Sequence, residues 1–534
     1  MRWEMFKLSQ WTERWDSEEV ALRRLNIQQQ TERDLTVLAS FALTLSVIAV
    51  GNSVLGNLNA CWDYGGPVAC IWSYVVVCFF TTFIGLSHAE IVSGLPAAGG
   101  PFFWASWFAG RHGPLAGWVT GYLNVLGSVG VTASVAQDAI QAVALIGFLL
   151  RGVDLSGPER YGIYMGMLVL SGLLNHMSTR SLARLAALSL LLVLIMVIAT
   201  LLLVPAVAPW HQSASFVFGR FRGWKDSSSG ITDNTYLILQ SSLMTMYIMT
   251  GFDAPAHLSE EIIGARSAAP VAIITALGAS YVLGLLLIIA LLFCIQDPAG
   301  LMDGTADGAA GYQIIFDAFM TRFGSQTWGI IYLIAPICSS VMCMVLCLAT
   351  NARVAWAFAR DKGLPCSAYF GKVSRSTKTP RRAVWLSVGI ALIMGLPMAD
   401  SQDAFNNGVL SVVTVVLQIS YGIPIAFKLT IGRQNFKPGP FSLGRYSLAC
   451  NGIAVFWVVV SSAALLTPNL YPITGARHWF TGHRHKPREF RLQRLQQLRY
   501  KDREKIQHGS QNCFIPPGSR YPAMALEIER SGAR

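Results

Sequence analysis

Long apolar runs separated by short polar stretches dominate the 534-residue chain. A helix needs about 20 mostly apolar residues to cross the ~30 Å hydrocarbon layer of a membrane. We therefore predict eleven membrane-spanning helices, near residues 37–58, 68–91, 115–138, 161–178, 182–205, 235–263, 271–294, 328–351, 383–398, 408–427 and 447–466.

Helices are favoured over barrel strands, because strands of a membrane barrel alternate apolar and polar residues whereas these runs are continuously apolar. Composition agrees: 53% of the residues are hydrophobic and only 13% are charged, which a water-facing globular surface would not tolerate. The pattern predicts an all-α, multi-pass integral membrane protein with the lipid bilayer as its main partner.

The charged residues indicate an orientation. If the N-terminus is cytoplasmic, the loop after the eighth run is cytoplasmic too, and residues 353–382 contain eight Lys and Arg. The opposite loops are poor in basic residues, since residues 59–67 have none. Basic residues concentrate on the cytoplasmic side of membrane proteins. We therefore predict a cytoplasmic N-terminus, and the net charge of +12 needs no nucleic-acid partner to explain it.

The C-terminal end does not fit this rule. Eleven spans would leave the tail on the external side, yet residues 475–505 carry ten Lys or Arg. The charge pattern therefore indicates that something is missing or unusual at this end. The expected organisation is a cytoplasmic tail at 1–34, a transmembrane domain at 35–474 and a basic, disordered tail at 475–534.

Two of the predicted helices are interrupted by Gly and polar residues. The first run contains the stretch from Val50 to Gly56, and the sixth contains the stretch from Thr250 to Pro255. The two helices are five spans apart, as in transporters built from inverted five-helix repeats, whose broken helices bind substrate near the middle of the membrane. Gly also serves close helix packing in membranes, and the pair at matching positions is what favours a binding site.

The interruptions suit a zwitterion or a cationic amine. The freed N–H groups at one half-helix end attract a carboxylate, and the freed carbonyls at the other attract an ammonium. An aromatic side chain such as Phe252, Tyr247 or Tyr421 would also suit a quaternary ammonium such as choline.

Several ionisable residues lie near these segments. Asp253, within the sixth run, would be costly to insert unless it faces protein or water, and is a candidate for proton coupling or for structure. His257, Glu260 and Glu261 follow, and a solvated helix end near the cytoplasmic interface is the expected setting for them. Glu90, at the end of the second run, either titrates during transport or anchors the following loop.

Neither cysteine nor histidine spacing indicates a catalytic or metal site. The ten cysteines form no CxxC or Cys/His ligand pattern, so we expect them to pack as small apolar residues. The nine histidines show no cluster with Asp or Ser at usable spacing. We expect no enzyme activity, no metal and no cofactor.

Three stretches resemble one family of transporters. They are the segment from Tyr247 to Glu261 with Ala268 to Pro270, the segment from Ala89 to Trp104, and the segment from Ala355 to Pro365 with Lys378 to Pro380; residues 417–424 agree. Over roughly residues 35–482 the chain resembles the fungal amino acid/choline permeases of the amino acid-polyamine-organocation superfamily, and is GABA-permease-like.

The resemblance implies ten core helices in two inverted repeats with the leucine-transporter-like fold, two peripheral helices, alternating access and proton-driven uptake at the plasma membrane. It implies that Gly51, Asn52 and Ser53 contact the substrate carboxylate. Tyr247, Thr250, Gly251 and Phe252 would contact and close over the amino group, and Asp253, Glu90, Glu260 and Tyr421 are candidates for coupling or gating. The expected partners are an amino acid or amine, and protons.

This chain departs from the resemblance near its end, where residues 471–474 run directly into residues 475–480 without the family's twelfth helix. A truncated permease or a transport-inactive, receptor-like protein is therefore one alternative, and a choline transporter is another. The sequence does not indicate an oligomeric state.

Overall fold

A computed structural model describes residues 22–467, apart from 24, 26, 152–153, 222–232, 299–300, 302–308 and 401–404. The described part is built from helices and contains no strand longer than the single bridge between Leu35 and Ile262. Two predictions lie outside the described residues: the absence of a twelfth helix after residues 471–474, and the disordered tail at 475–534.

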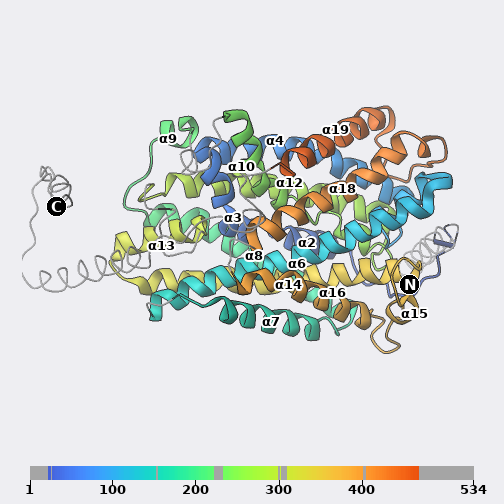
Figure 1. The fold of residues 1–534 in the computed structure, drawn as a ribbon, viewed down its shortest axis with the longest axis horizontal. Helices are drawn as coiled ribbons and strands as arrows, with labels where there is room; N and C mark the ends of the chain where they lie inside the picture. The colour runs from blue at the N-terminus through green and yellow to red at the C-terminus, as the bar shows by residue number, and fades with distance from the viewer. Residues whose placement is uncertain are drawn as a thin grey trace, which may run out of the picture. The chain divides into compact units, whose positions relative to one another are not determined.

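Each of the eleven predicted runs corresponds to helix in the structure (Figure 1). The principal helices are α2 (Val37–Ile48), α3 (Val50–Asn57), α4 (Asn59–Gly94), α6 (Gly113–Arg151), α7 (Gly157–Leu174), α8 (Thr179–Val207), α10 (Asn234–Ile248), α12 (Ala265–Phe293), α14 (Gln326–Arg360), α16 (Arg381–Met394), α18 (Ser411–Leu429) and α19 (Ser447–Leu465).

Shorter helices connect or cap these spans. They are α5 (Pro101–Phe108), α9 (Ala214–Gly219), α11 (Ala254–His257), α13 (Ala310–Phe323) and α15 (Ser367–Phe370), with one-turn elements at Gly110–His112, Leu396–Ala399, Phe405–Leu410, Gly432–Gln434 and Gly444–Tyr446. By length and composition, eight helices of the described part could cross a membrane, counting α2 and α3 as one. The other predicted runs fall outside this count: α10 and α16 are shorter than 18 residues, and α7 has Glu159 and Arg160 in its first turn.

The segment at 59–67 is helical, where the sequence suggested a loop. α4 continues from it into the second span across a kink, at which Gly66 has φ 66° and ψ −157° and Pro67 follows. Glycine tolerates this positive φ, and proline cannot donate a helical N–H, so at these two residues one helix ends and the next begins within α4.

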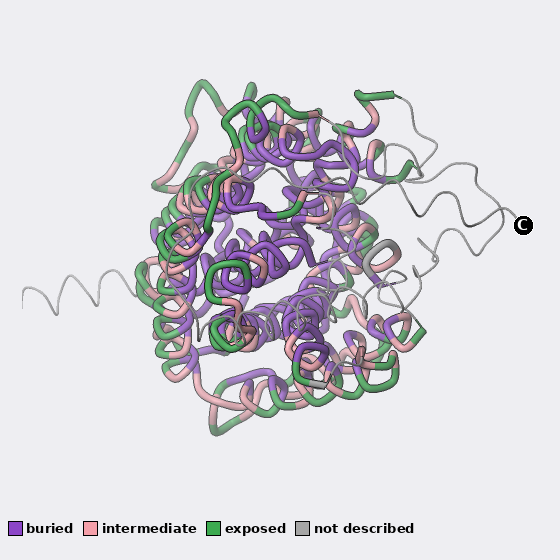
Figure 2. The backbone as a smooth tube through the Cα atoms, turned by 90° about the vertical axis from the view of Figure 1, so that its left-hand side faces the viewer, coloured by how far each residue is buried: buried purple, intermediate pink, exposed green. Residues whose placement is uncertain are grey.

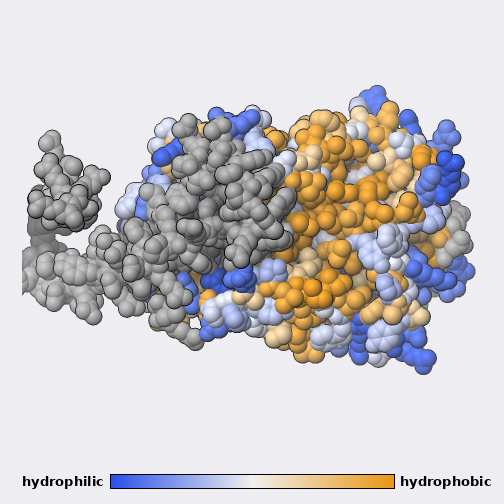
Figure 3. Space-filling view, viewed as in Figure 1, coloured by the Kyte–Doolittle hydropathy of each residue, from blue (hydrophilic) through white to orange (hydrophobic). Residues whose placement is uncertain are grey.

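The protein buries its polar side chains and exposes apolar ones along the middle of its spans. Viewed end-on, buried residues fill the interior of the helix bundle and exposed residues line its outside (Figure 2). On the face seen in Figure 3, hydrophobic residues gather in the middle and hydrophilic ones at the right-hand end. Exposed Phe79 on α4, Leu202 on α8 and Val282 on α12 illustrate a surface suited to lipid.

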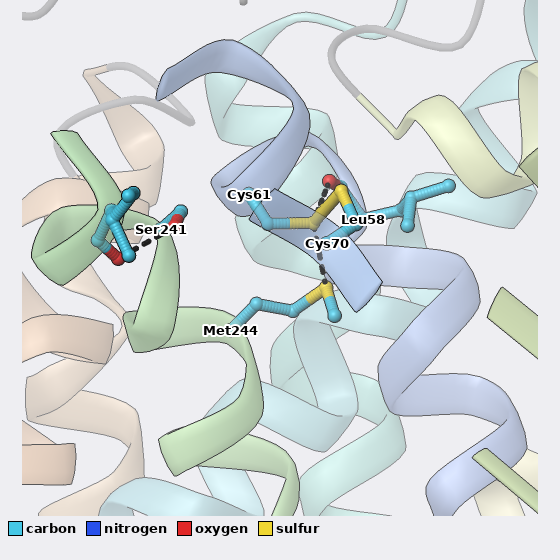
Figure 4. Close-up of a disulfide and its surroundings, with 6 residues drawn as sticks. Leu58, Cys61, Cys70, Ser241 and Met244 are labelled. Carbon is cyan, nitrogen blue, oxygen red and sulfur yellow. Dashed lines mark hydrogen bonds between the residues drawn. A yellow bond between two sulfur atoms is a disulfide. The ribbon is translucent and has the colours of Figure 1, made fainter. Parts of the chain in front are cut away.

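A disulfide joins Cys61 and Cys70 within α4, on either side of the kink (Figure 4). The Sγ of Cys61 also lies 3.4 Å from the Sδ of Met244 on α10. This corrects the expectation that all the cysteines serve only as small packing residues. The free cysteines of the described part are Cys78, Cys294, Cys338, Cys343, Cys347, Cys366 and Cys450.

Candidate functional site

The first span is broken one residue before the predicted segment. α2 ends at Ile48, Ala49 adopts the left-handed conformation (φ 49°, ψ 39°), and α3 begins at Val50. Gly51, Asn52 and Ser53 are therefore helical: Gly51 and Asn52 lie in the first turn of α3, where helical N–H groups have no partner within the helix, whereas the Ser53 N–H already donates to the Ala49 carbonyl at 2.9 Å. The break frees the predicted donors, but Ala49 rather than Gly51 makes the turn.

The three predicted residues have different surroundings. A Cβ at Gly51 would collide with the Met196 and Val197 side chains of α8, so Gly51 lies where α3 and α8 pack closely. The Asn52 side-chain amide donates to Ser339 Oγ of α14 at 3.0 Å, and its Oδ1 has no partner within the described residues. These contacts hold α3 against both α8 and α14.

The sixth span is broken where the sequence predicts. α10 ends at Ile248, the backbone unwinds through Thr250 and Gly251, and the one-turn helix α11 starts at Ala254. Gly251 has φ 81°, a conformation that side chains with a Cβ rarely adopt. Thr250 Oγ1 donates back to the Tyr247 carbonyl at 2.7 Å, which satisfies one of the carbonyls at the end of α10.

The two breaks meet in the interior. A Cβ on Gly251 would come within 2.8 Å of Val47 Cγ1, so the unwound part of the sixth span lies directly against the end of α2. The Val47 carbonyl faces the thiols of Cys343 and Cys347, at 3.9 and 3.8 Å. A cavity lined by Val47 of α2 and by Gly251 and Asp253 of the sixth span has about 20 Å³ of space for water, enough for roughly one molecule. Gly51, Asn52 and Ser53 do not line it. The structure thus describes a closed arrangement.

Asp253 is the centre of a hydrogen-bond network beside this cavity. Its Oδ2 lies 2.8 Å from His257 Nε2, and its Oδ1 accepts a 2.8 Å hydrogen bond from the Tyr421 hydroxyl of α18. The same hydroxyl accepts from the Gly251 N–H at 3.4 Å. The network therefore ties the unwound segment of the sixth span to α18, and it satisfies an aspartate that would otherwise be costly to bury.

Aromatic rings close over the break. Phe252 is fully buried, and its ring centroid lies 5.0 Å from that of Tyr421 and 5.6 Å from that of His88. His88 Nε2 lies 3.2 Å from the Tyr421 carbonyl, and its ring packs edge-on against Trp104. Phe252 and Tyr421 thus lie side by side, and His88 joins them from α4.

His257, Glu260 and Glu261 are buried, which corrects the expected solvated helix end. Glu260 binds Arg360 at 3.0 Å and accepts from the Ala98 N–H at 3.2 Å. Glu261 forms a two-pronged ion pair with Arg353, at 2.9 and 3.1 Å. Each acid is only 1% exposed because α14 supplies an arginine to it, a contact that the local sequence could not reveal.

Glu90 is likewise paired rather than free. Lys428 of α18 donates to it, as do the Ser447 hydroxyl at 2.6 Å and the Leu443 N–H at 3.0 Å. Of the two roles considered from the sequence, its contacts fit anchoring, but the segment it anchors is the one between α18 and α19 rather than the one that follows α4.

Residues 29–35, just before the first span, pack against the segment that follows α11 in the broken sixth span. Leu35 and Ile262 form a parallel bridge, and the Leu35 N–H donates to the Glu261 carbonyl at 3.0 Å. Gln29 donates to the Glu260 carbonyl at 2.6 Å and Arg33 to the Ile262 carbonyl at 3.1 Å. The N-terminal segment and the ion pairs together seal the end of the bundle that contains α15.

A buried polar stripe on α6 was not found from the sequence. Ser134, Gln137, Asp138 and Gln141 recur at helical spacing and are each 2% exposed. Asp138 accepts from Asn57 Nδ2 of α3 at 3.2 Å. The sequence did contain a signal for this stripe, because Asp138 lies within a predicted span and an aspartate there is a candidate functional residue. In the described part of the chain, no group of three or more His, Cys, Asp and Glu side chains could hold a metal ion.

Comparison with known proteins decides the family. The model of the amino acid permease family matches residues 35–483. The chain belongs to this family. It is 35% identical to the amino-acid permease BAT1 of Arabidopsis thaliana over 501 residues, which cover 88% of this chain and 96% of that protein.

Two further relatives agree with this assignment. This permease is 34% identical to the BAT1 homolog of Oryza sativa subsp. japonica, over 88% of its own length and 95% of that protein. It is 26% identical to the GABA-specific permease of Saccharomyces cerevisiae, over 79% of its own length and 74% of that protein. The chain is therefore an integral, multi-pass membrane protein of a transporter family, as its sequence predicts, and not an enzyme.

Proposed function

We propose that this permease takes up an amino acid together with protons by alternating access at the plasma membrane. The observation that carries the proposal is the meeting of the two broken helices at Val47 and Gly251, inside a closed bundle. Family membership supports amino acid transport, and the relatives named above include a GABA-specific permease. The comparisons do not favour choline over an amino acid.

The substrate would bind between the breaks. Its carboxylate would be held by the free N–H groups of Gly51 and Asn52 in the first turn of α3, with the Ser53 hydroxyl beside them, since the Ser53 N–H is already bonded to the Ala49 carbonyl. Its amino group would face the carbonyls freed near Val47 and Thr250, where α2 and α10 end. The cavity is too small for an amino acid in this state, so binding requires the breaks to separate, as alternating access demands.

The contacts of the candidate coupling and gating residues suggest distinct tasks. Tyr247 and Phe252 would close over the substrate, while Tyr421 would release Asp253 and Gly251 when the site opens. Glu260 and Glu90 would hold the cytoplasmic end shut through Arg360 and Lys428. The five-plus-five inverted repeat remains our interpretation of the two breaks and their spacing.

We also propose a cytoplasmic N-terminus. The basic loop between α14 and α16 supports it. The disulfide supports it as well, because disulfides persist in oxidising compartments and Cys61–Cys70 lies at the end of the first span that would face outward.

Uptake tests the proposal directly. Labelled amino acids, GABA and choline would be offered to permease-deficient cells that express the full chain, with and without a protonophore. Gly251→Leu serves as the inactive control, because a large side chain would collide with Val47. We expect saturable uptake of one or more amino acids, sensitive to the protonophore and absent in the control. Surface expression without uptake of any of them would instead favour a receptor-like role.

A further inference from the structure

The carboxyl group of Asp138 has an unusual environment for a membrane interior. It lies in the middle of α6 and is 2% exposed. Its Oδ1 accepts from Asn57, whereas its Oδ2 has no hydrogen-bond partner among the described residues. Every other acid discussed above, namely Asp253, Glu90, Glu260 and Glu261, faces a basic side chain.

The groups that face Asp138 from the surrounding helices are neutral. Tyr247 comes from α10, Cys343 from α14, and Tyr312 from α13, whose hydroxyl donates to the Asp138 main-chain carbonyl at 3.3 Å. Asn57 comes from α3. No Lys, Arg or His in the described part of the chain forms an ion pair with this carboxylate.

A buried carboxylate without a cation is costly, and a group in this position binds a proton instead. A proton on Oδ2 adds almost no volume, which matters because the site is tightly packed. A Cβ on Gly56 would lie 2.6 Å from Asp138 Oδ1. The closed arrangement therefore suits a protonated, neutral Asp138.

The elements around Asp138 are those that must move when the site opens. Asn57 is at the end of α3, the half-helix that starts at the first break, and Tyr247 is one turn before the second break at Gly251. Separation of the breaks would withdraw Asn57 and admit water to the carboxyl group. Hydration favours the ionised form, so opening and closing would change the proton occupancy of Asp138.

We propose that Asp138 carries the coupled proton. In the outward-open state its carboxylate takes a proton from external water, forming the Oδ2–H bond. The neutral acid is buried when the site closes over substrate, and the O–H bond breaks again when cytoplasmic water reaches it and accepts the proton. This assignment rests on the proposed proton-coupled function and adds the residue that performs the coupling.

The test uses the full chain in proteoliposomes and the amino acid identified by the uptake screen. Two modes are compared: accumulation driven by a pH gradient, and exchange of labelled for unlabelled substrate without a gradient. Asp138→Asn has the same shape and mimics the protonated acid permanently. We expect it to lose gradient-driven accumulation and the pH dependence of uptake, while exchange continues.

Asp233→Asn is the matched control. Asp233 is the exposed N-cap of α10, and asparagine caps a helix equally well, so both modes should survive. Asp138→Glu keeps a titratable group in a longer side chain, and should keep accumulation but shift the pH at which it is half-maximal.

Three results would overturn the assignment. They are pH-driven accumulation by Asp138→Asn, loss of exchange together with accumulation in that variant, and, if that variant fails to fold, an unchanged pH profile of Asp138→Glu. Wild-type uptake that changes with neither the pH gradient nor a protonophore would instead refute the proposed proton coupling itself. Failure of the Asp138 assignment and failure of the proposed function are therefore distinguishable.

Discussion

Tyr421 shows how a single hydroxyl connects the proposed substrate site to a helix far along the chain. It donates to Asp253 Oδ1 and accepts from the Gly251 N–H, and so bridges α18 and the broken sixth span. A hydrogen bond to a charged group contributes about 1.5–3 kcal/mol to stability. In a transporter that alternates between states, such a bond biases the equilibrium toward the state that contains it.

We expect Tyr421→Phe to lower the initial rate of uptake about tenfold or more. Loss of about 1.4 kcal/mol of free energy that favours one conformation changes the conformational equilibrium tenfold. The variant should still reach the membrane, since the ring and its packing on Phe252 are kept. Tyr161→Phe is the control: it removes one hydrogen bond to the Leu392 carbonyl, between α7 and α16, away from the site. Equal rates for the two variants would contradict a gating role for Tyr421.

At the scale of elements, buried ion pairs fix the position of α14 relative to the sixth span. Arg353 and Glu261 are 2% and 1% exposed and share two hydrogen bonds. Removing one partner of a buried pair leaves an uncompensated charge and costs about 3–5 kcal/mol. Replacing both partners costs much less, because no lone charge remains.

Arg353→Met should therefore lower the free energy of unfolding by about 3–5 kcal/mol, measured by thermal or denaturant unfolding in detergent. The double variant Arg353→Met/Glu261→Gln should recover most of this loss. Arg180→Met is the matched control, because the Arg180–Asp34 pair is exposed (71% and 23%), and its loss should cost at most about 1 kcal/mol. If the double variant is as unstable as Arg353→Met, the uncompensated charge of Glu261 is not the cause of the lost stability.

The disulfide acts on the same scale, at the junction of α3 and α4. It closes a loop of ten residues, and a loop of this size is expected to contribute about 2–3 kcal/mol. We expect Cys61→Ala/Cys70→Ala to unfold at a lower temperature than the wild type, and reductant to lower only the wild-type value. Alkylation of Cys61 or Cys70 in the unreduced, denatured wild-type protein would show that the bond is absent.

The sequence predicts elements better than partners. Each of the eleven apolar runs corresponds to helix, and Gly251 marked the second break, because both signals are local, whereas the shorter helices α5 and α13 were not predicted. The first break was misplaced because Ala49, which has no sequence signature for a left-handed residue, makes the turn. Glu261 was expected in solvent because its partner Arg353 is 92 residues away, and Asp138 was passed over within an apolar run.

The two ends of the whole molecule differ in chemistry. The basic loop with α15 lies at one end, to the right in Figure 1. The buried ion pairs of Arg353 and Arg360 lie near the end of α14 that leads into this loop. The opposite end contains α9, which packs on the start of α4 through Trp62 and Phe216, beside the disulfide. Under the proposed orientation the basic end would face the reducing cytosol and the end with the disulfide an oxidising compartment.

Thiol labelling can establish that direction. Cys366, exposed beside α15, marks the proposed cytoplasmic end, and Ser215→Cys on α9 would mark the other. Each reporter would be the only accessible thiol in a background with Cys338→Ser and Cys513→Ser, plus Cys366→Ser for the α9 reporter. We expect a membrane-impermeant maleimide to label the α9 reporter in intact cells and Cys366 only after permeabilisation.

The reverse pattern would invert the topology, and with it the direction in which protons reach Asp138. Labelling of neither reporter until the plasma membrane is opened would place the permease in an internal membrane, where the outward-facing end meets an organelle lumen. The disulfide is also compatible with an oxidising organelle lumen. Labelling therefore decides in which membrane the permease lies, and the intact disulfide supports the same orientation in either membrane.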